Sequence, residues 1–132
     1  MNALGTHLLL ELRDCDSKSL NDLHLVREML TSTAERIGAT VIGDSFHEFS
    51  PQGVTGVVAI AESHLCIHTW PEYEYAAVDI FTCGDSIDPE DAVPYIVTAL
   101  DAGDHSVISL KRGILPAIPN AVGVPATAGS GV

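Results

Sequence analysis

VTGVVAIAESHLCIHTWPEYEYAAVDIFT, residues 54–82, contains three short apolar segments in close succession. Residues 54–61, 65–70 and 75–82 are rich in β-branched and aromatic side chains, which is typical of strands. Residues 71–74 separate the second segment from the third. Gly56 inside the first segment indicates a bulge or a close approach of backbone. This stretch therefore predicts three consecutive strands.

A helix is predicted before this stretch, over residues 17–38. Ser19, followed three residues later by Asp22, is suited to cap its N-terminus. Gly38 stands where a left-handed residue ends a helix. Apolar residues recur at steps of three and four, which places them on one helix face: Leu20, Leu23, Val26, Leu30, Ala34 and Ile37.

A second helix is predicted after the stretch, starting at Asp88 with Pro89 in its first turn and ending before Gly103. Pro94 conflicts with that start, because an interior proline removes a hydrogen bond and clashes with the preceding turn. Two alternatives stay open: the helix begins at Pro94, or it is kinked there.

Strands over residues 7–13, 39–49 and 106–111 complete the pattern. The predicted order is β-α-β-β-β-β-α-β. The fold class is therefore α+β, a two-layer sandwich in which two helices pack on one face of a mostly antiparallel sheet. We expect one domain over residues 1–114 and a poorly ordered tail, rich in Pro, Gly and Ala, over residues 115–132.

Composition narrows the function classes. Of the 132 residues, 46% are hydrophobic and 18% charged, which excludes a disordered chain. The net charge of -12 argues against nucleic acid and anionic membrane as partners. No apolar run is long enough to cross a bilayer, and the first residues lack the pattern of a signal peptide. Three scattered cysteines suit a reducing compartment, so we expect a cytoplasmic protein.

Several kinds of site compete for the residues between 46 and 84. His64, Cys66 and His68 alternate along a strand, so they share a face and could bind zinc, although this spacing is not a usual zinc pattern. Ser63 lacks the G-x-S-x-G sequence of a serine hydrolase nucleophile. A single His or Cys is most often a core residue. That default holds for four residues: Cys15, Cys66, His24 and His105.

A fourth possibility rests on resemblance. FHEFSPQGVTGVVAIAESHLCIHTWPEYEYAAVDIFTCGD, residues 46–85, resembles the prokaryotic S-adenosylmethionine decarboxylase proenzymes, and so does LGTHLLLEL, residues 4–12. The likeness covers about residues 4–113, and ESHLxIHTWPE is a specific string. In that family the chain cuts itself before a serine, which becomes a covalent pyruvoyl group. The family makes decarboxylated S-adenosylmethionine, the aminopropyl donor for spermidine.

The resemblance implies a cut between Glu62 and Ser63, giving a β-chain of residues 1–62 and an α-chain of residues 63–132. It assigns His68 as the processing base and implies that a hydroxyl at position 55 assists in the processing reaction. Thr55 stands here where the family usually has Ser. The pyruvoyl group from Ser63 would form a Schiff base with the substrate, with neither metal nor pyridoxal phosphate.

Further roles follow from the same resemblance. Cys83 matches the donor that protonates the substrate carbon after CO₂ leaves. Phe49 matches an aromatic that stacks on adenine, and Glu72 matches a carboxylate that accepts from the ribose hydroxyls. Trp70 could shape the pocket. His7 and His64 receive no role.

A geometric difficulty bears on the assembly. On one unbroken strand over residues 62–70, Ser63 and His68 would point to opposite faces. Either the chain bends at residues 62–64, or His68 serves a different protomer. The resemblance implies a homodimer of αβ protomers with shared active sites. Ser63 and Cys83 of one chain would then meet residues of the other: Phe49, Thr55, His68 and Glu72.

Two other functions remain open. The same chemistry could act on another cationic amino acid, such as arginine or ornithine. Alternatively, the chain could be an unprocessed regulatory subunit without activity. The retained Phe49 and Glu72 favour a nucleoside ligand, and the intact Ser63, His68 and Cys83 favour an enzyme.

Overall fold

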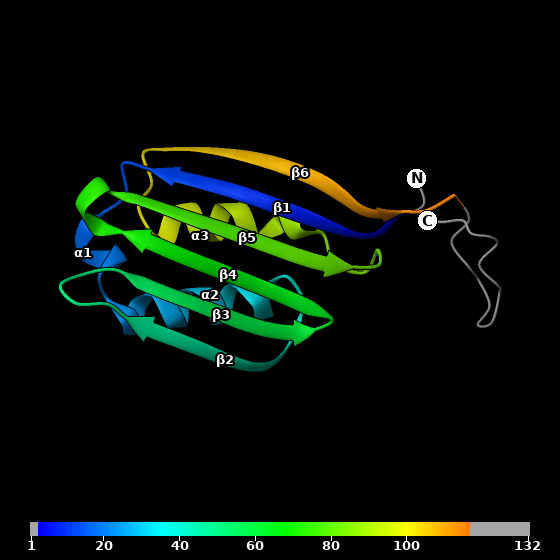
Figure 1. Ribbon diagram of the computed structural model, residues 1–132, viewed down its shortest axis with the longest axis horizontal. Helices are drawn as coiled ribbons and strands as arrows, with labels where there is room; N and C mark the ends of the chain where they lie inside the picture. Colours follow the sequence, from blue (N-terminus) through cyan, green and yellow to red (C-terminus); the bar gives the residue numbers. More distant parts are fainter. Residues whose placement is uncertain (1–2, 117–132) are drawn as a thin grey trace.

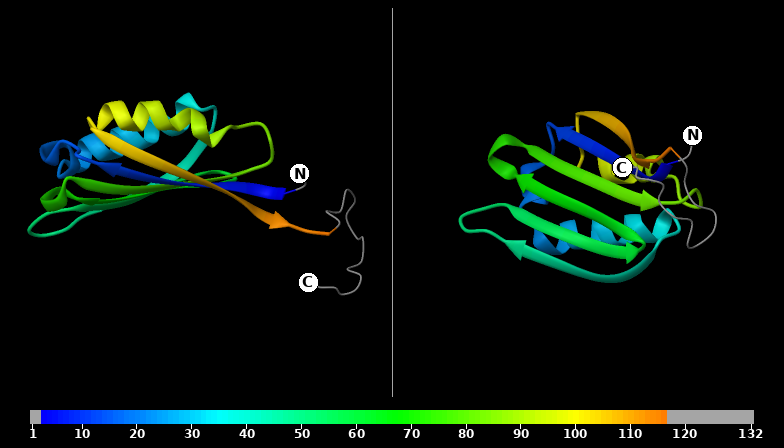
Figure 2. Two further views of the ribbon diagram at one scale, coloured as in Figure 1. Left: turned by 90° about the horizontal axis from the view of Figure 1, so that it is seen from above. Right: turned by 45° about the vertical axis from the view of Figure 1, so that its right-hand side comes forward.

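Helices lie on one face of a single sheet in the computed structural model, which describes residues 3–116 (Figure 1, Figure 2). The predicted fold class is therefore confirmed. In chain order the elements are β1 (Ala3–Arg13), α1 (Ser17–Leu20), α2 (Leu23–Arg36), β2 (Thr40–Glu48), β3 (Val54–Ala61), β4 (Ser63–Trp70), η1 (Pro71–Tyr73), β5 (Tyr75–Cys83), η2 (Pro89–Ala92), α3 (Val93–Ala99) and β6 (Asp104–Ile114).

The sheet has six strands in the order β2-β3-β4-β5-β1-β6, and every neighbouring pair is antiparallel. β2 to β5 follow the chain, so hairpins connect them (Figure 1). β1 joins the far side of β5, and β6 pairs with β1 at the edge. Segments from both ends of the chain therefore lie next to the central hairpin that carries most of the predicted site.

Alternation along the strands builds the core between sheet and helices. In β3 and β4 every second side chain is buried, including Val58, Ile60, Leu65 and Ile67. Burying an aliphatic side chain of this size stabilises the fold by about 1.5–3 kcal/mol. The helices contribute their own apolar stripe to the same layer, including Val26, Leu30 and Ile96.

The other side chains of each strand point to the opposite side of the sheet, which we call the open face. Among residues 3–116 no helix lies on this face (Figure 2, left). Strand alternation and register place a common set of side chains there: His7, Thr55, His64, Cys66, His68, Asp79, Phe81, Cys83, Ile108, Leu110 and Arg112.

The single helix predicted over residues 17–38 is wrong, because the structure has two helices, α1 and α2. The carboxylate of Asp16, rather than Ser19, caps α1 by accepting from Ser19 N at 3.2 Å. Asp22 starts a new helix by accepting from Leu25 N at 3.1 Å. Such caps satisfy backbone N–H groups that have no partner within the helix. Gly38 has a φ of 92°, so the predicted left-handed end is confirmed.

The helix predicted near Pro94 is α3, which begins at Val93, so Pro94 lies in its first turn, where proline is tolerated. This agrees with the alternative in which the helix starts at Pro94. The residues before it form the short 3-10 helix η2, which Asp88 caps.

Gly56 lies against the ring of Phe46, which leaves no room for a Cβ. The close approach predicted at Gly56 is present, but it is made by a side-chain ring and not by backbone. The alternative prediction of a bulge in this strand is wrong, because the register shift lies in β2, between residues 41 and 43.

None of the helices within residues 3–116 is both long enough and apolar enough to cross a bilayer. The strands at both ends of the chain are longer than predicted, since β1 starts at Ala3 and β6 ends at Ile114. The tail predicted over residues 115–132 lies outside the described residues except for its first two positions.

Candidate active site

The β3–β4 turn places Ser63 at the first position of β4, and β5 ends at Cys83 beside it. The register pairs Ser63 with Thr82, the neighbour of Cys83. Ser63 Oγ lies 3.4 Å from Cys83 Sγ, and both side chains are half-buried. Two groups twenty positions apart in the chain are therefore in direct contact.

Ser63 adopts an unusual backbone conformation, with a φ of 132°. Positive φ values are uncommon for residues other than glycine and cost about 1–3 kcal/mol. Plain alternation would give Ser63 the buried face of Leu65, yet its side chain meets Cys83 on the open face. The chain therefore bends at residues 62–64, which was one of the two predicted alternatives.

Thr55 and His68 form a second pair on the open face. They are directly opposite each other in β3 and β4, and Thr55 Oγ1 lies 3.0 Å from His68 Nδ1. The pair lines a shallow groove of about 240 Å³ together with residues of β2, β3 and β4: Ser45, His47, Gly56, Val57 and Cys66. A hydroxyl bonded to an imidazole can fix the ring orientation and exchange a proton with it.

The three predicted substrate contacts lie toward the end of the sheet where β4 finishes. Phe49 follows β2 and packs edge-on against His47, with ring centroids 4.5 Å apart. Trp70 stacks on Tyr75 with ring centroids 5.3 Å apart. Glu72 is exposed in η1. All three side chains are accessible to a ligand.

The candidate residues therefore fall into two groups along β4. Ser63 and Cys83 lie where β4 begins and β5 ends, at the right of Figure 1, and the pair of Thr55 and His68 lies further along. His68 is five residues beyond Ser63, which is about 16 Å at roughly 3.3 Å per residue. Proton transfer needs groups within about 3 Å or one bridging water. Within a single chain, His68 does not reach Ser63.

The cysteines outside this contact are poor nucleophiles. Cys15 is buried, as predicted, whereas Cys66 is only half-buried in the groove, so its default placement in the core is wrong. Burial, followed by the charge of Asp79, raises the pKa of the Cys66 thiol to about 11. Burial likewise raises the pKa of Cys15 to about 11. Both thiols are therefore protonated at neutral pH, and the thiolate is the reactive form.

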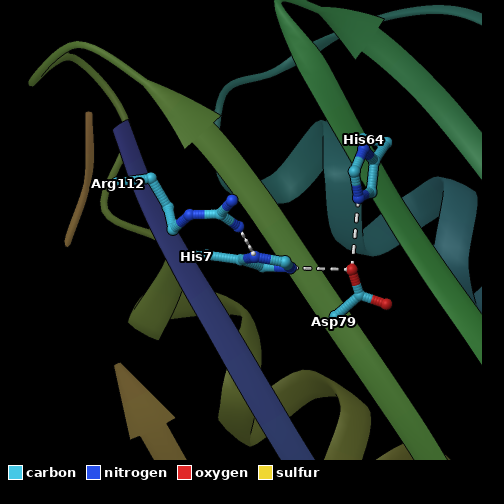
Figure 3. Close-up of polar contacts among 4 residues, drawn as sticks. All are labelled: His7, His64, Asp79 and Arg112. Carbon is cyan, nitrogen blue, oxygen red and sulfur yellow. Dashed lines mark hydrogen bonds and ion pairs between the residues drawn. The ribbon is translucent and has the colours of Figure 1, made fainter. Parts of the chain in front are cut away.

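The zinc alternative built on His64, Cys66 and His68 is not supported by the geometry. His68 bonds to Thr55, whereas His64 turns to Asp79. Within residues 3–116, the group that brings three metal-ligand atoms within 4.8 Å of one another is instead His7, His64 and Asp79 (Figure 3). The hydrolase alternative is not supported either, since Ser63 Oγ contacts a thiol and not an imidazole.

Sequence reasoning did not connect His7, Asp79 and Arg112, which the structure brings together beside His64. The available signal was Asp79 alone, the single charged residue of strand β5.

His24 and His105 are both exposed, so their default placement in the core is wrong. His24 lies on the solvent side of α2, where the apolar stripe is interrupted. His105 lies on the edge strand β6, which has a neighbouring strand on one side only. Neither histidine is near Ser63 or the groove.

Comparison with known proteins agrees with this geometry. Residues 6–113 match the family model described as S-adenosylmethionine decarboxylase. The chain is 54% identical over 115 residues to the S-adenosylmethionine decarboxylase proenzyme of Thermodesulfovibrio yellowstonii, covering 87% of this chain and 85% of that protein. It is 51% identical over 113 residues to the proenzyme of Methanococcus aeolicus, covering 86% and 97%.

A solved structure resembles the whole fold. The crystal structure of the adenosylmethionine decarboxylase from Aquifex aeolicus superposes with a TM-score of 0.80 and 35% sequence identity. The match covers 92% of this chain and 100% of that one. With the family model spanning residues 6–113 and relatives about half identical over most of their length, this chain belongs to the S-adenosylmethionine decarboxylase family.

Proposed function

We propose that this chain cleaves itself between Glu62 and Ser63 and then decarboxylates S-adenosylmethionine, forming the aminopropyl donor for spermidine synthesis. The observation that carries the proposal is the contact of Ser63 Oγ with Cys83 Sγ at a turn with positive φ. The relatives named proenzymes support it, because that word describes a chain that must be processed.

The cleavage chemistry uses the residues at the turn. Ser63 Oγ attacks the carbonyl carbon of Glu62, and the peptide nitrogen leaves as an amine, so an ester replaces the amide. A base removes the Ser63 α-proton, and elimination releases the Glu62 carboxylate. The dehydroalanine left at position 63 takes up water and loses ammonia. A strained φ at Ser63 supports this route, because strain at the reacting peptide is relieved when it opens.

The site suits a pyruvoyl group at position 63, since its precursor hydroxyl lies against a thiol that can hold a proton for delivery. A pyruvoyl group supplies an electron sink for loss of CO₂, which no ordinary side chain provides. Cys83 is the proton donor to the substrate carbon. We propose that neither a metal nor pyridoxal phosphate takes part.

We propose that the active protein is a homodimer with shared sites. Ser63 and Cys83 of one protomer would meet the groove of the other, where His68 acts as the processing base and Thr55 fixes its ring. A two-fold axis that runs along the open face at right angles to the strands reverses the direction of β4 in the partner. The start of β4 in one protomer can then face the His68 part of β4 in the other, so the separation of about 16 Å along β4 supports this arrangement. Exposed apolar side chains on that face also support it, including Trp70, Ile108 and Leu110.

In this arrangement the predicted substrate contacts come from the same protomer as the groove. Phe49 stacks on the adenine, which is worth about 1–3 kcal/mol. Glu72 accepts from the ribose hydroxyls in charge-assisted bonds. Trp70 shapes the adjoining wall beside Tyr75.

The net charge of -12 suits a cationic substrate and disfavours nucleic acid and anionic membrane as partners. The 1–114 domain, its tail and a cytoplasmic location remain predictions.

Release of labelled CO₂ from carboxyl-labelled S-adenosylmethionine by the purified protein tests the activity. We expect turnover with this substrate and none with arginine or ornithine. Turnover of arginine or ornithine alone would mean that the same chemistry acts on another substrate. A protein that stays as a single chain on a denaturing gel and releases no CO₂ would be a regulatory subunit.

Cys83→Ala should separate processing from turnover. The thiol acts only after CO₂ has left, so cleavage at Ser63 should proceed at close to the wild-type rate. Loss of a general acid should lower kcat by about 10²–10⁴-fold. Gel densitometry gives the first quantity and CO₂ release the second. An unchanged kcat would contradict the role of Cys83.

A further inference from the structure

Four side chains form a hydrogen-bonded row across the open face, on the neighbouring strands β6, β1, β5 and β4 (Figure 3). Arg112 Nη1 lies 3.1 Å from His7 Nδ1, and His7 Nε2 lies 2.9 Å from Asp79 Oδ2. His64 Nε2 approaches the same Asp79 oxygen at 3.1 Å. We call these four residues the His64 row.

The partners fix the direction of every bond in the row. A guanidinium only donates, so His7 Nδ1 accepts from Arg112 and its single proton must be on Nε2. That proton is donated to Asp79, since a carboxylate only accepts. His64 Nε2 donates to Asp79 for the same reason. The ring of His64 is therefore held by a chain of hydrogen bonds that runs through the three strands β5, β1 and β6.

This arrangement argues for a positioning network and against a metal centre. A metal ligand needs a free lone pair, and His7 Nε2 carries a proton as long as Arg112 donates to Nδ1. The charges already balance, with one guanidinium and one carboxylate in the row. The fractional exposures of the His7, Asp79 and His64 side chains are 18%, 28% and 35%, so water competes only partly for these bonds.

The anchored ring belongs to the residue that follows Ser63. A positive φ at a serine persists only when its surroundings hold it in place. On the C-terminal side the next side chain is His64, and Asp79 holds it. Released from this anchor, the Ser63 backbone could relax toward negative φ and move Oγ away from the Glu62 carbonyl carbon.

We propose that Arg112, His7 and Asp79 are positioning residues that lock the His64 ring, and through it the Ser63 backbone, in the conformation from which the chain cleaves itself. The inference rests on the proposed self-cleavage. The acyl shift needs Ser63 Oγ within about 3–3.5 Å of the Glu62 carbonyl carbon, and an error of about 1 Å can cost about 10²-fold in rate.

The test is the first-order rate of cleavage after cell-free synthesis of the full chain, followed by intact mass. His64→Phe and Asp79→Ala should slow cleavage by at least about tenfold. His64→Gln should stay within about 1.5-fold of wild type, because its amide N–H can replace the Nε2–H donor to Asp79. If His64→Gln is as slow as His64→Phe, the imidazole acts as an acid or base and the positioning role is wrong.

Neighbouring residues on β6 give a matched control. Lys111 lies on the other face of the strand, with Nζ 2.9 Å from Thr6 Oγ1. Lys111→Ala should cleave at the wild-type rate. Arg112→Ala removes the donor that keeps the His7 proton on Nε2, so the bond from His7 to Asp79 weakens and cleavage should be about threefold slower. Equal rates for the two variants, with His64→Phe also unaffected, would overturn the inference. A wild-type chain that never cleaves would remove the proposed function, and this inference with it.

A second readout does not depend on cleavage. Long-range ¹H–¹⁵N spectra of the Ser63→Ala chain report which ring nitrogen of each histidine carries a proton. We expect His7 and His64 to be protonated on Nε2, with the His7 pattern changed by Arg112→Ala and unchanged by Lys111→Ala. A His7 ring protonated on Nδ1 in the parent chain would contradict the row. Thermal unfolding of the same chains shows whether each one is folded.

Discussion

A Ser63→Ala chain will stay intact over residues 1–132 and release no CO₂ from S-adenosylmethionine. The methyl group cannot attack the Glu62 carbonyl, and no dehydroalanine or ketone can form at position 63 without the oxygen. We expect both cleavage and turnover to fall by more than about 10³-fold, to background. Intact mass measures the first and labelled CO₂ the second.

Ser86→Ala is a suitable control, because Ser86 is exposed in the segment just after β5. It should cleave and turn over as the wild type does. The Ser63→Ala chain should also fold, since Ser63 Oγ contributes a single contact, to Cys83. Fragments of residues 1–62 and 63–132 from the Ser63→Ala chain would place the chemistry elsewhere.

His68→Ala and Ser63→Ala chains, each inactive alone, should restore activity to each other when co-expressed. In a mixed dimer one site combines Ser63 of the His68→Ala chain with His68 of the Ser63→Ala chain, and the other site lacks both. Only the His68→Ala chain should therefore be cut. Its α-chain carries the substitution at position 68, so its lower mass identifies it without ambiguity.

The geometry makes this outcome a strong test. Ser63 and His68 both reach the open face but lie about 16 Å apart along β4, too far for proton transfer within a chain. Mixed dimers captured with two different affinity tags should show cleavage and CO₂ release. Mixed dimers that remain uncut would refute shared sites. A His68→Ala chain that cleaves alone at the wild-type rate would refute its role as the base.

Local patterns predicted the strands well. The segment predicted over residues 54–61 coincides with β3, because alternate burial leaves a clear period of two in the sequence. The helix over residues 17–38 was predicted as one because its apolar spacing runs through the break. The Asp22 carboxylate starts a second helix by accepting a hydrogen bond from Leu25 N. The spacing of apolar residues does not detect such a local side-chain bond.

The site was predictable only in part, for reasons of topology and backbone. Resemblance named Ser63 and Cys83, but their contact depends on the β4–β5 register. Alternation alone placed Ser63 on the buried face, and its positive φ overrides that rule. The bond from His7 to Asp79 joins residues 72 positions apart, so it exists only once β1 has paired with β5.

We propose that this chain makes its own electron sink at position 63. The most direct test of this claim is borohydride reduction of fresh protein in the presence of S-adenosylmethionine, followed by intact mass of each fragment. We predict two fragments, with the ligand-derived mass fixed to residues 63–132 through a carbon–nitrogen bond at position 63, and no addition to residues 1–62. An uncut chain that gains no mass under the same conditions would contradict the claim.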